Sequence, residues 1–301
     1  MSKILIIGSS NIDLIACVKH LPAPGETVGE ARFMQSNGGK GANQAVAAAR
    51  LGGDVTFVSC LGDDANAASL RQQFSNDGID TRALLTASHT PTGTALIYVA
   101  EDGENCIAVA PGANRLLGPE AIDALTDRIA EADYLLLQLE IPMESVARAI
   151  EKAAEVGTRV ILNPAPAHPI ADELLRKIYL ITPNRSESEI LTGCQVRTPQ
   201  EASEAAARLL EKGVENVIIT LGCHGALIRT PHAETIVPAC KVTAVDTTAA
   251  GDVFNGALVV ALAEGMTLVE GARFAARCSA VSVTRPGAQT SIPWRSEIDA
   301  R

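Results

Sequence analysis

Short apolar runs alternate with helical patterns along most of this chain. The apolar runs cover residues 4–7, 55–58, 134–139, 160–162, 180–182 and 217–220, and the helical patterns cover 42–51, 65–77, 119–131, 144–156, 199–212, 252–264 and 272–283. Runs that are apolar on both faces are typical of parallel strands covered by helices. The alternation predicts an α/β fold with a doubly wound, mostly parallel sheet flanked by helices and joined by right-handed crossovers.

Two segments interrupt this alternation. Residues 13–37 and 92–110 contain β-type patches separated by turn residues. The patches can pair as a small β-sheet that covers one edge of the main domain as a lid; the alternative is a β excursion without a role. We therefore expect an α/β domain made of residues 1–12, 38–91 and 111–301, and a lid made of residues 13–37 and 92–110.

Charge and cysteine pattern exclude several classes of protein. The net charge is −10 without a sustained run of Lys or Arg, which argues against nucleic-acid binding because phosphate contacts need clustered cations. The seven cysteines are scattered without a CxxC pair, so neither a zinc site nor a disulfide framework is indicated. No apolar run approaches the length of a membrane span, and the apolar N-terminus is too short for a signal peptide. We expect a cytoplasmic protein.

The stretch from residue 246 to 256 carries the strongest chemical signal. A polar, glycine-bearing turn leads directly into an apolar helical pattern, and the small residues Ala249, Ala250 and Gly251 allow a ligand close to the backbone. The free N–H groups of such a helix start bind anions. Asp252 in the first turn places a potential base beside this anion hole, as phosphoryl transfer requires. The alternative is an ordinary, well-capped helix.

Two loops suit a sugar. Ligands bind at the carboxyl ends of strands in such sheets. After the first strand, Asn11 and Asp13 offer donors and acceptors for adjacent hydroxyls, in a loop that lacks the GxGxxG dinucleotide pattern. An Asx turn is the alternative for either residue. Near residue 40, Gly39 lets the backbone approach a ligand, and Lys40 and Asn43 project from the start of a helix without P-loop spacing.

Later strand ends carry further candidates. Glu140 follows the strand predicted over 134–139, where a solvated carboxylate is the alternative. Asn184 and Glu187 lie three apart before a helix and can hold water around Mg²⁺, although the same spacing is a capping-box signature. Thr220 ends a strand, and the glycine turn after it can lie against a flat or phosphorylated ligand.

Residues 38–44 and 246–252 together resemble the PfkB carbohydrate kinase family, and the resemblance runs from residue 4 to the end of the chain. Residues 138–140, 163–167 and the tail from 284 to 295 are most similar to the ribokinase branch of that family. The resemblance implies a ribokinase-like fold and ATP-dependent phosphorylation of D-ribose at its 5-hydroxyl, with Mg²⁺ as cofactor and activation by K⁺. It also implies a homodimer in which the lid sheets of two subunits pack together.

The resemblance assigns roles to individual positions. The base is Asp252, and the anion hole is the backbone of Ala249, Ala250, Gly251 and Asp252. The sugar is held by Asn11, Asp13, Gly39, Lys40, Asn43 and Glu140. The nucleotide is contacted by Thr220, Gly222, Gly225 and Gly251, with Asn184 and Glu187 on the Mg²⁺–phosphate group. The monovalent cation is held by Asp246, Thr248, Ser282, Arg285, Gly287 and Ser291, several through backbone carbonyls. Ala276 departs from the pattern, because ribokinases often carry a polar residue there, beside the adenine.

Other functions remain alternatives. A kinase of the same family acting on deoxyribose, a nucleoside or a hexose would keep the same mechanism. A sugar or nucleotide sensor on the same scaffold could dispense with the base, whereas here Asp252 and the whole anion-hole segment are present. An NAD-dependent oxidoreductase is disfavoured because the glycine fingerprint is missing.

Overall fold

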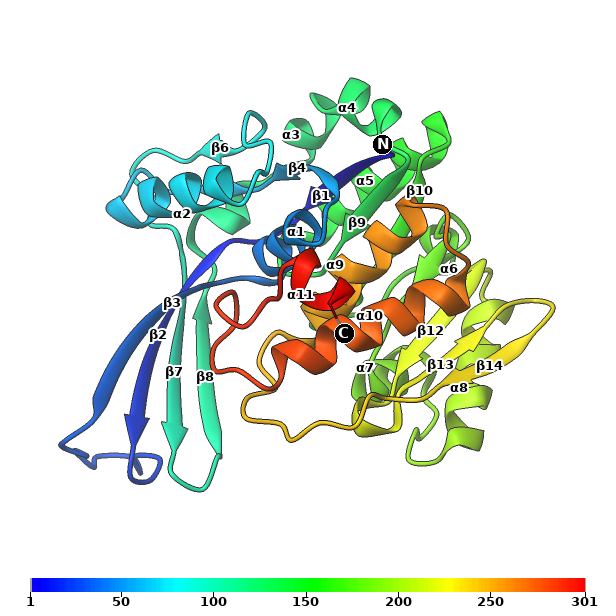
Figure 1. Cartoon of the computed structure of the whole chain (residues 1–301). Coiled ribbons are helices and arrows are strands. Elements are labelled where there is room, and N and C mark those ends of the chain that lie inside the picture. The colour runs from blue at the N-terminus through cyan, green and yellow to red at the C-terminus, as the bar shows by residue number, and fades with distance from the viewer. Residues whose placement is uncertain (1, 301) are drawn as a thin grey trace.

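The computed structural model describes residues 2–300 and confirms the predicted α/β architecture (Figure 1). The main sheet has eight strands in the order β14-β13-β12-β11-β10-β9-β1-β4. Their bounds are β1 Lys3–Ile7, β4 Asp54–Val58, β9 Tyr134–Leu137, β10 Arg159–Leu162, β11 Leu180–Ile181, β12 Asn216–Thr220, β13 Ala226–Arg229 and β14 Glu234–Val237.

All six strands predicted from apolar runs lie in this sheet, and all pair in parallel. The hairpin β13–β14 was not predicted; it adds two antiparallel strands beyond β12. Its strands have only four residues each, too few for the sequence to show a clear period. A hairpin at the edge of a parallel sheet is a common addition in such folds.

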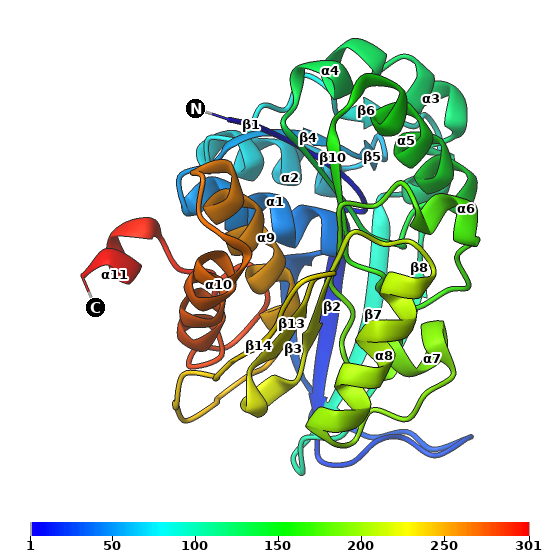
Figure 2. The same cartoon turned by 90° about the vertical axis from the view of Figure 1, so that its right-hand side faces the viewer.

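Helices cover both faces of the sheet (Figure 2). The longer helices are α1 Lys40–Arg50, α2 Ala65–Asn76, α5 Met143–Val156, α7 Arg185–Thr192, α8 Pro199–Glu211, α9 Ala250–Ala263 and α10 Leu268–Ser282. The short helices are α3 Pro119–Asp123, α4 Thr126–Glu131, α6 Asp172–Leu175, α11 Arg295–Asp299 and the 3-10 turns Gly112–Leu116 and Gly222–His224. One apolar core lies between the sheet and α1, α2, α9, α10 and α11, and the other lies between the sheet and α3, α4, α5, α6 and α8.

Two predicted helices differ from those observed. The helix predicted over 119–131 is two helices, because the Leu125 amide donates to the Ile122 carbonyl and the Thr126 hydroxyl donates to the Asp123 carbonyl. The helix predicted over 272–283 begins one turn earlier, at Leu268, where Thr267 and Glu270 form a capping box.

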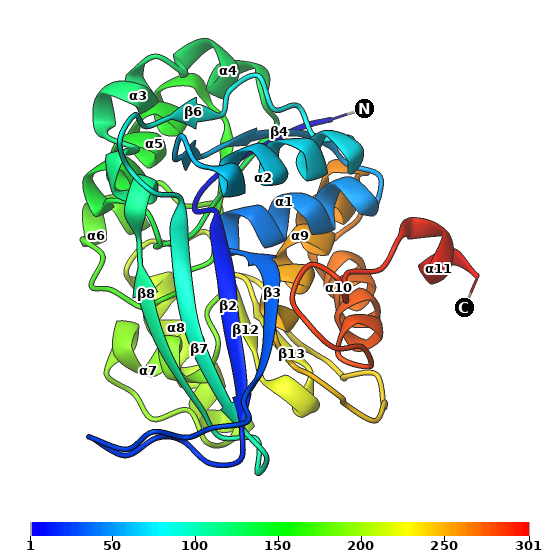
Figure 3. The ribbon, with the colours of Figure 1, turned by 90° about the vertical axis from the view of Figure 1, so that its left-hand side faces the viewer.

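The two β-rich segments do form a separate small sheet, projecting from the main body (Figures 1 and 3). Its strands are β2 Asn11–Val18, β3 Arg32–Gly38, β7 Gly93–Ala100 and β8 Asn105–Ala110, in the order β3-β2-β7-β8. The central pair β2–β7 is parallel, and the outer pairs are antiparallel. A two-stranded pair, β5 Cys60–Leu61 with β6 Leu85–Thr86, lies beside the main sheet. The domain boundaries drawn from the sequence stay a prediction.

No helix within residues 2–300 combines the length and the apolar content that crossing a bilayer requires.

Candidate active site

Polar side chains from distant parts of the chain meet at the carboxyl edge of the main sheet. Asn11 follows β1, Glu140 follows β9, Asn163 follows β10, Asn184 follows β11 and Thr220 ends β12. The helices α1 and α9 begin at this same edge, where Asn43 of one contacts Asp252 of the other. Parallel strands end on one side of the sheet, so one fold brings together residues spread over most of the sequence.

Asp252 lies in the first turn of α9, with 6% of its surface exposed. Asn43 Nδ2 donates to its Oδ2 at 2.9 Å, and Gln44 Nε2 donates to its Oδ1 at 2.9 Å. Gln44 Nε2 also donates to Asn163 Oδ1 at 3.0 Å, and Gln44 Oε1 accepts from Gln138 Nε2 at 2.6 Å. Two neighbouring amides of α1 therefore fix the orientation of the carboxylate.

The charges around Asp252 adjust its proton affinity. Burial raises the pKa of Asp252; the Lys40 ammonium and the two amide donors oppose this, and Glu140 adds to it, so the pKa of Asp252 lies above its ordinary value. Burial alone would lower the pKa of Lys40, but Asp252, Glu140 and Glu187 reverse that effect and raise it. Lys40 thus stays charged, and Asp252 is a stronger base than a solvated aspartate.

The start of α9 presents free backbone N–H groups. Ala249 adopts a left-handed conformation with φ 58°, which costs an L-residue about 1–2 kcal/mol. The Ala250 amide donates to the Thr247 carbonyl at 3.2 Å. Within residues 2–300 the amides of Gly251 and Asp252 find no acceptor, and a Cβ placed on Gly251 would have no neighbour within 4 Å. These two amides are left free to bind an anion, and there is room beside Gly251.

Glu140 and Asn11 are each held by a residue that the sequence did not single out, Ser9 for Glu140 and Asn114 for Asn11. Glu140 Oε2 accepts from the Ser9 hydroxyl at 2.6 Å and from the Lys40 amide at 3.0 Å. Asn114 Nδ2 donates to Asn11 Oδ1 at 2.8 Å and to the carbonyl of residue 10 at 3.1 Å. Both candidate sugar ligands are therefore held rigidly before a sugar binds.

Asp13 is a buried carboxyl on β2, beside Glu140 and Asp252. Burial raises the pKa of Asp13 to about 6, and the charges of Glu140 and Asp252 contribute in the same direction. A site with three nearby carboxylates and one ammonium suits a neutral, hydroxyl-rich ligand, because hydroxyl groups donate to carboxylates.

Gly39 brings the start of α1 against the start of β2. Its φ is 88°, and a Cβ on it would lie 2.8 Å from the Asn11 backbone nitrogen, so glycine is required on both counts. Beside this contact a cavity of about 600 Å³ is lined in part by Asn11, Asn114 and Glu140. Its size is within the range of small-molecule sites.

The nucleotide candidates lie at the ends of β11 and β12. Asn184 and Glu187 form the capping box of α7: Asn184 Oδ1 accepts from the Glu187 amide at 2.9 Å, and the Glu187 carboxylate accepts from the Asn184 amide and side chain at 2.8 Å each. Thr220 leads into the turn that contains Gly222, with φ 60°, and Gly225, with φ 93°. An isolated β-bridge between Asn184 and Thr220 places Asn184 beside this turn.

Asp246 joins the two segments of the candidate cation site. Its carboxylate accepts from the amide and hydroxyl of Thr248 at 2.8 and 2.6 Å and from the Gly287 amide at 2.8 Å. Burial would raise the pKa of Asp246, but these bonds outweigh it and lower the pKa, so the carboxylate stays charged. The Arg285 side chain pairs with Glu297.

The Ser282 hydroxyl donates a hydrogen bond to the Ser279 carbonyl at 2.9 Å, and the Ser291 hydroxyl donates one to the Ala288 carbonyl at 2.8 Å. Of the six predicted cation ligands, Asp246, Thr248 and Gly287 are joined by hydrogen bonds, and the Arg285 amide donates to the Ser282 carbonyl at 3.0 Å. Within residues 2–300 no cluster of three or more His, Cys, Asp or Glu side chains is arranged to bind a metal ion. A cation here would need carbonyl oxygens or water in addition to the Asp246 carboxylate.

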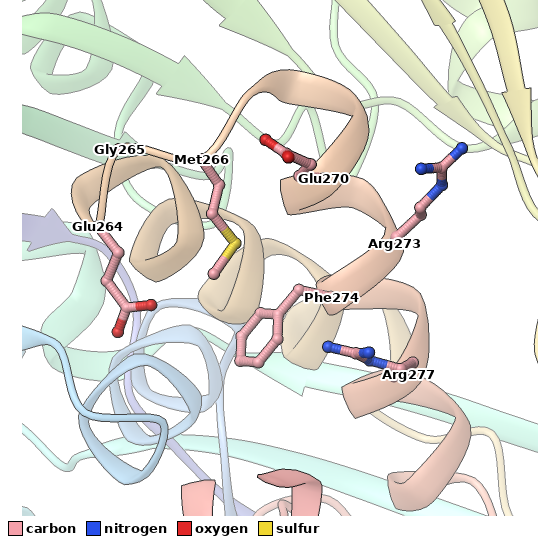
Figure 4. A pocket seen from close by; sticks show the side chains of 7 residues that line it. All are labelled: Glu264, Gly265, Met266, Glu270, Arg273, Phe274 and Arg277. Carbon is pink, nitrogen blue, oxygen red and sulfur yellow. The ribbon is translucent and has the colours of Figure 1, made fainter. Parts of the chain in front are cut away.

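A second pocket lies at the other end of α9, between its last turn and the start of α10 (Figure 4). It measures about 440 Å³, and its charged side chains are Glu264, Glu270, Arg273 and Arg277. With 1.5 Å of rise per residue, the twelve-residue step from 252 to 264 places it about 18 Å from Asp252. It contains none of the candidate site residues.

Known proteins match this chain over nearly its full length, and they confirm the resemblance seen in the sequence. A family model described as "pfkB family carbohydrate kinase" matches residues 1–295. A ribokinase of Haemophilus influenzae is 45% identical over 292 residues, which are 97% of this chain and 95% of the relative. A deoxyribokinase of Salmonella typhi is 39% identical over 291 residues, 96% of this chain and 95% of the relative.

Among solved structures, that of an Arabidopsis thaliana ribokinase complexed with ribose and ATP superposes with a TM-score of 0.93. It is 32% identical, and the match covers 99% of this chain and 98% of the other.

Proposed function

Because the chain belongs to the pfkB family of carbohydrate kinases, we propose that it transfers the γ-phosphoryl group of ATP to the 5-hydroxyl of D-ribose. Relatives named ribokinase over nearly the full length support this activity. One observation carries the mechanism: a buried carboxylate, a charged lysine and two free backbone amides converge where α1 and α9 begin.

In this mechanism the sugar lies between β2 and α1. The Asp13 and Glu140 carboxylates accept hydrogen bonds from its hydroxyl groups, while Asn11, Lys40 and Asn43 donate to its oxygens and the Gly39 backbone lies against it. Ser9 and Asn114 keep Glu140 and Asn11 in place. Binding through preorganised groups aligns the 5-hydroxyl with Asp252 at little cost in side-chain entropy.

Asp252 accepts the proton of the 5-hydroxyl as the new O–P bond forms. The phosphoryl group passes through a loose transition state whose charge lies on its equatorial oxygens. The amides of Gly251 and Asp252, at the positive end of α9, stabilise that charge together with Lys40. Burial of the site excludes water, which would otherwise compete with the sugar as nucleophile.

Two cations fit the residues present. Glu187 accepts two bonds from Asn184 and keeps lone pairs for water, which suits Mg²⁺ held through its water shell. When bound, Mg²⁺ would neutralise charge on the β- and γ-phosphates. A monovalent cation such as K⁺ fits the charged Asp246, with Thr248, Gly287 and the carbonyls of residues 282, 285 and 291 as ligands, beside the loop that forms the anion hole. On the nucleotide side, Thr220, Gly222 and Gly225 would contact ATP, and the small Ala276 would lie near the adenine.

The small sheet is proposed as the lid and as the dimer contact. It carries large apolar side chains that are exposed in the single chain, including Phe33 at 65% and Ile107 at 54%. Exposed apolar surface of this extent marks a protein contact.

An assay of ADP formation from ATP and Mg²⁺ tests the function. D-ribose is compared with 2-deoxyribose and adenosine, with and without K⁺. Ribose should give the highest kcat/KM, raised by K⁺. A preference for 2-deoxyribose would favour the second candidate, which the match to a deoxyribokinase supports.

Asp252→Asn should lower kcat by about 10²–10⁴-fold while the protein keeps a cooperative thermal transition. The exposed Asp299→Asn serves as the matched control and should retain full activity. If the Asp252 variant turned over at near wild-type rate, the assignment of the base would be wrong. Ligand binding without turnover in the wild type would favour a sensor.

A further inference from the structure

A continuous series of side-chain amides ends on Asp252. Asn37 Nδ2 on β3 donates to Gln73 Oε1 on α2. Gln73 Nε2 donates to Gln289 Oε1 at 2.7 Å, and Gln289 Nε2 donates to Asn43 Oδ1 at 3.1 Å. Asn43 Nδ2 completes the series by donating to Asp252 at 2.9 Å. These four amides form what we name the amide chain.

Each of the four amides donates its N–H group toward Asp252 and accepts a hydrogen bond, if any, from the side away from it. The carboxylate explains this common direction. An ionised carboxylate accepts hydrogen bonds and cannot donate them, so Asn43 must direct its NH₂ group at Asp252. Its oxygen then faces Gln289, which must direct its own NH₂ group at Asn43. The same rule fixes Gln73 and Asn37. Aligned amides polarise one another, which strengthens the last bond to the charge.

Gln289 is the rigid link of the amide chain. Gln289 is 3% exposed, and its backbone carbonyl accepts a hydrogen bond from Arg50 Nη1 at 2.8 Å. Arg50 is itself fixed by an ion pair with Asp77 at 2.9 Å. Two residues earlier, the Gly287 amide donates to Asp246. Gln289 therefore stands between the candidate cation loop and the base.

We propose that Gln289 is a positioning residue that makes Asn43 present its N–H group to the Asp252 carboxylate, and that Gln73 and Asn37 extend this control to strand β3 of the small sheet. Without Gln289 only the ionised carboxylate holds the Asn43 amide in this orientation, so the amide is free to turn over once Asp252 binds a proton. Its oxygen would then face Asp252, an arrangement that only the protonated, inactive carboxyl accepts. The proposal rests on the proposed function in taking Asp252 as the base.

The charged groups that face Asp252 are the same in every variant used below. They are Lys40 on α1, Glu187 on α7, Asp13 on β2 and Glu140 after β9. The substitutions are neutral, so a changed titration reports the lost hydrogen bond and not an added charge.

The test titrates Asp252 directly in the protein without ligands. ¹³C-carboxyl aspartate labelling gives its resonance, assigned by its loss in Asp252→Asn. In Gln289→Leu the carboxyl should titrate roughly one pH unit higher than in wild type, because one charge-assisted hydrogen bond is weakened. Gln73→Leu, one link further away and half-buried, should shift it by a few tenths of a unit in the same direction. The acid limb of the single-turnover rate with ribose should move by matching amounts.

Gln72→Leu is the matched control, because Gln72 is exposed on the same helix and bonds only within it, to Asn76. It should change nothing. An unshifted carboxyl in Gln73→Leu and in any folded Gln289→Leu would overturn the proposal, even if activity fell equally at all pH values. Since the titration needs no substrate, a shift in a protein that fails to phosphorylate ribose would refute the proposed function and leave this inference standing.

Discussion

At the scale of single residues, the site combines buried carboxyl groups with a small number of compensating groups. Asp252 has one ammonium and two amides to offset its burial, whereas Asp13 has no hydrogen-bond donor among the described residues and its pKa rises to about 6. Asp13 is therefore a carboxyl whose charge changes at about pH 6.

Ribose binding should weaken as the pH falls through 6, because protonated Asp13 loses an acceptor for the sugar. Asp13→Asn should bind ribose weakly at every pH and lose that part of the pH dependence. Isothermal titration with ribose between pH 5 and 8 measures both effects. Asp102→Asn, at the exposed tip of the same sheet, is the control and should behave as wild type.

Titration of Asp13 should also change the free energy of unfolding, and the direction of its pKa shift determines the sign of that change. The folded state raises the pKa of Asp13 from 3.8 to about 6, so between these values the folded protein binds more protons than the unfolded one. The contribution of Asp13 to the free energy of unfolding then falls as pH rises from about 4 to 6 and is constant above that range. Asp13→Asn should take this contribution out of the slope in urea unfolding. A slope that the substitution left unchanged would belong to other groups.

At the scale of elements, the contact between α1 and α9 positions the Asp252 carboxylate against the side-chain amides of Asn43 and Gln44. The two helices approach closely at Gly256, where a Cβ would lie 2.6 Å from Ala47 Cβ and 2.7 Å from the Gln44 carbonyl. Gly251, one turn earlier on α9, has open space where its Cβ would be. Glycine is therefore required for packing at position 256, and at position 251 we propose that it serves ligand access.

Gly256→Ala should lower the free energy of unfolding by about 1–3 kcal/mol, because the Gln44 backbone cannot retreat. Gly251→Ala should leave stability unchanged or slightly higher, since alanine is the better helix former. It should nevertheless lower kcat/KM for ATP at least about tenfold by crowding the anion hole. Thermal unfolding and steady-state kinetics on both variants separate the two roles. Equal losses of stability would contradict the assignment of Gly251 to ligand access.

At the scale of the whole molecule, the small sheet is apolar on both faces. The register places Leu96 and Tyr98 on the face opposite Asp13, and Ile107 and Val109 on the face of Asp13. All four side chains are between 43% and 54% exposed. A thin sheet in water normally keeps one polar face, so a second copy of the chain is the proposed cover.

The double variant Leu96→Asp/Ile107→Asp places a charge on each face and should convert a dimer into a monomer. Sedimentation velocity should then report a mass of 31.4 kDa in place of twice that value. Ile236→Asp, comparably exposed on the edge strand β14, is the control and should stay dimeric. A wild-type protein that sediments as a monomer at micromolar concentration would refute the dimer.

The sequence by itself determined the elements and the type of chemistry. Apolar runs and helical periods operate over about ten residues, so all six parallel strands could be predicted from them. The stretch from Ala249 to Asp252 predicted a helix start that binds an anion, because backbone N–H groups and an adjacent carboxylate are local features. The start of a helix was harder to predict where a capping residue determines it, as Thr267 does for α10.

The tertiary structure decided which residues act together. The parallel pairing of β2 with β7 and the bonds of Ser9, Asn114 and Gln289 all join residues far apart in the chain. Glutamines and asparagines carry no periodic signal and no charge, so their partners depend on where packed helices and strands place them. The sequence supplied a candidate base and a candidate anion hole, and only the fold supplied the side-chain amides that hold the Asp252 carboxylate in position.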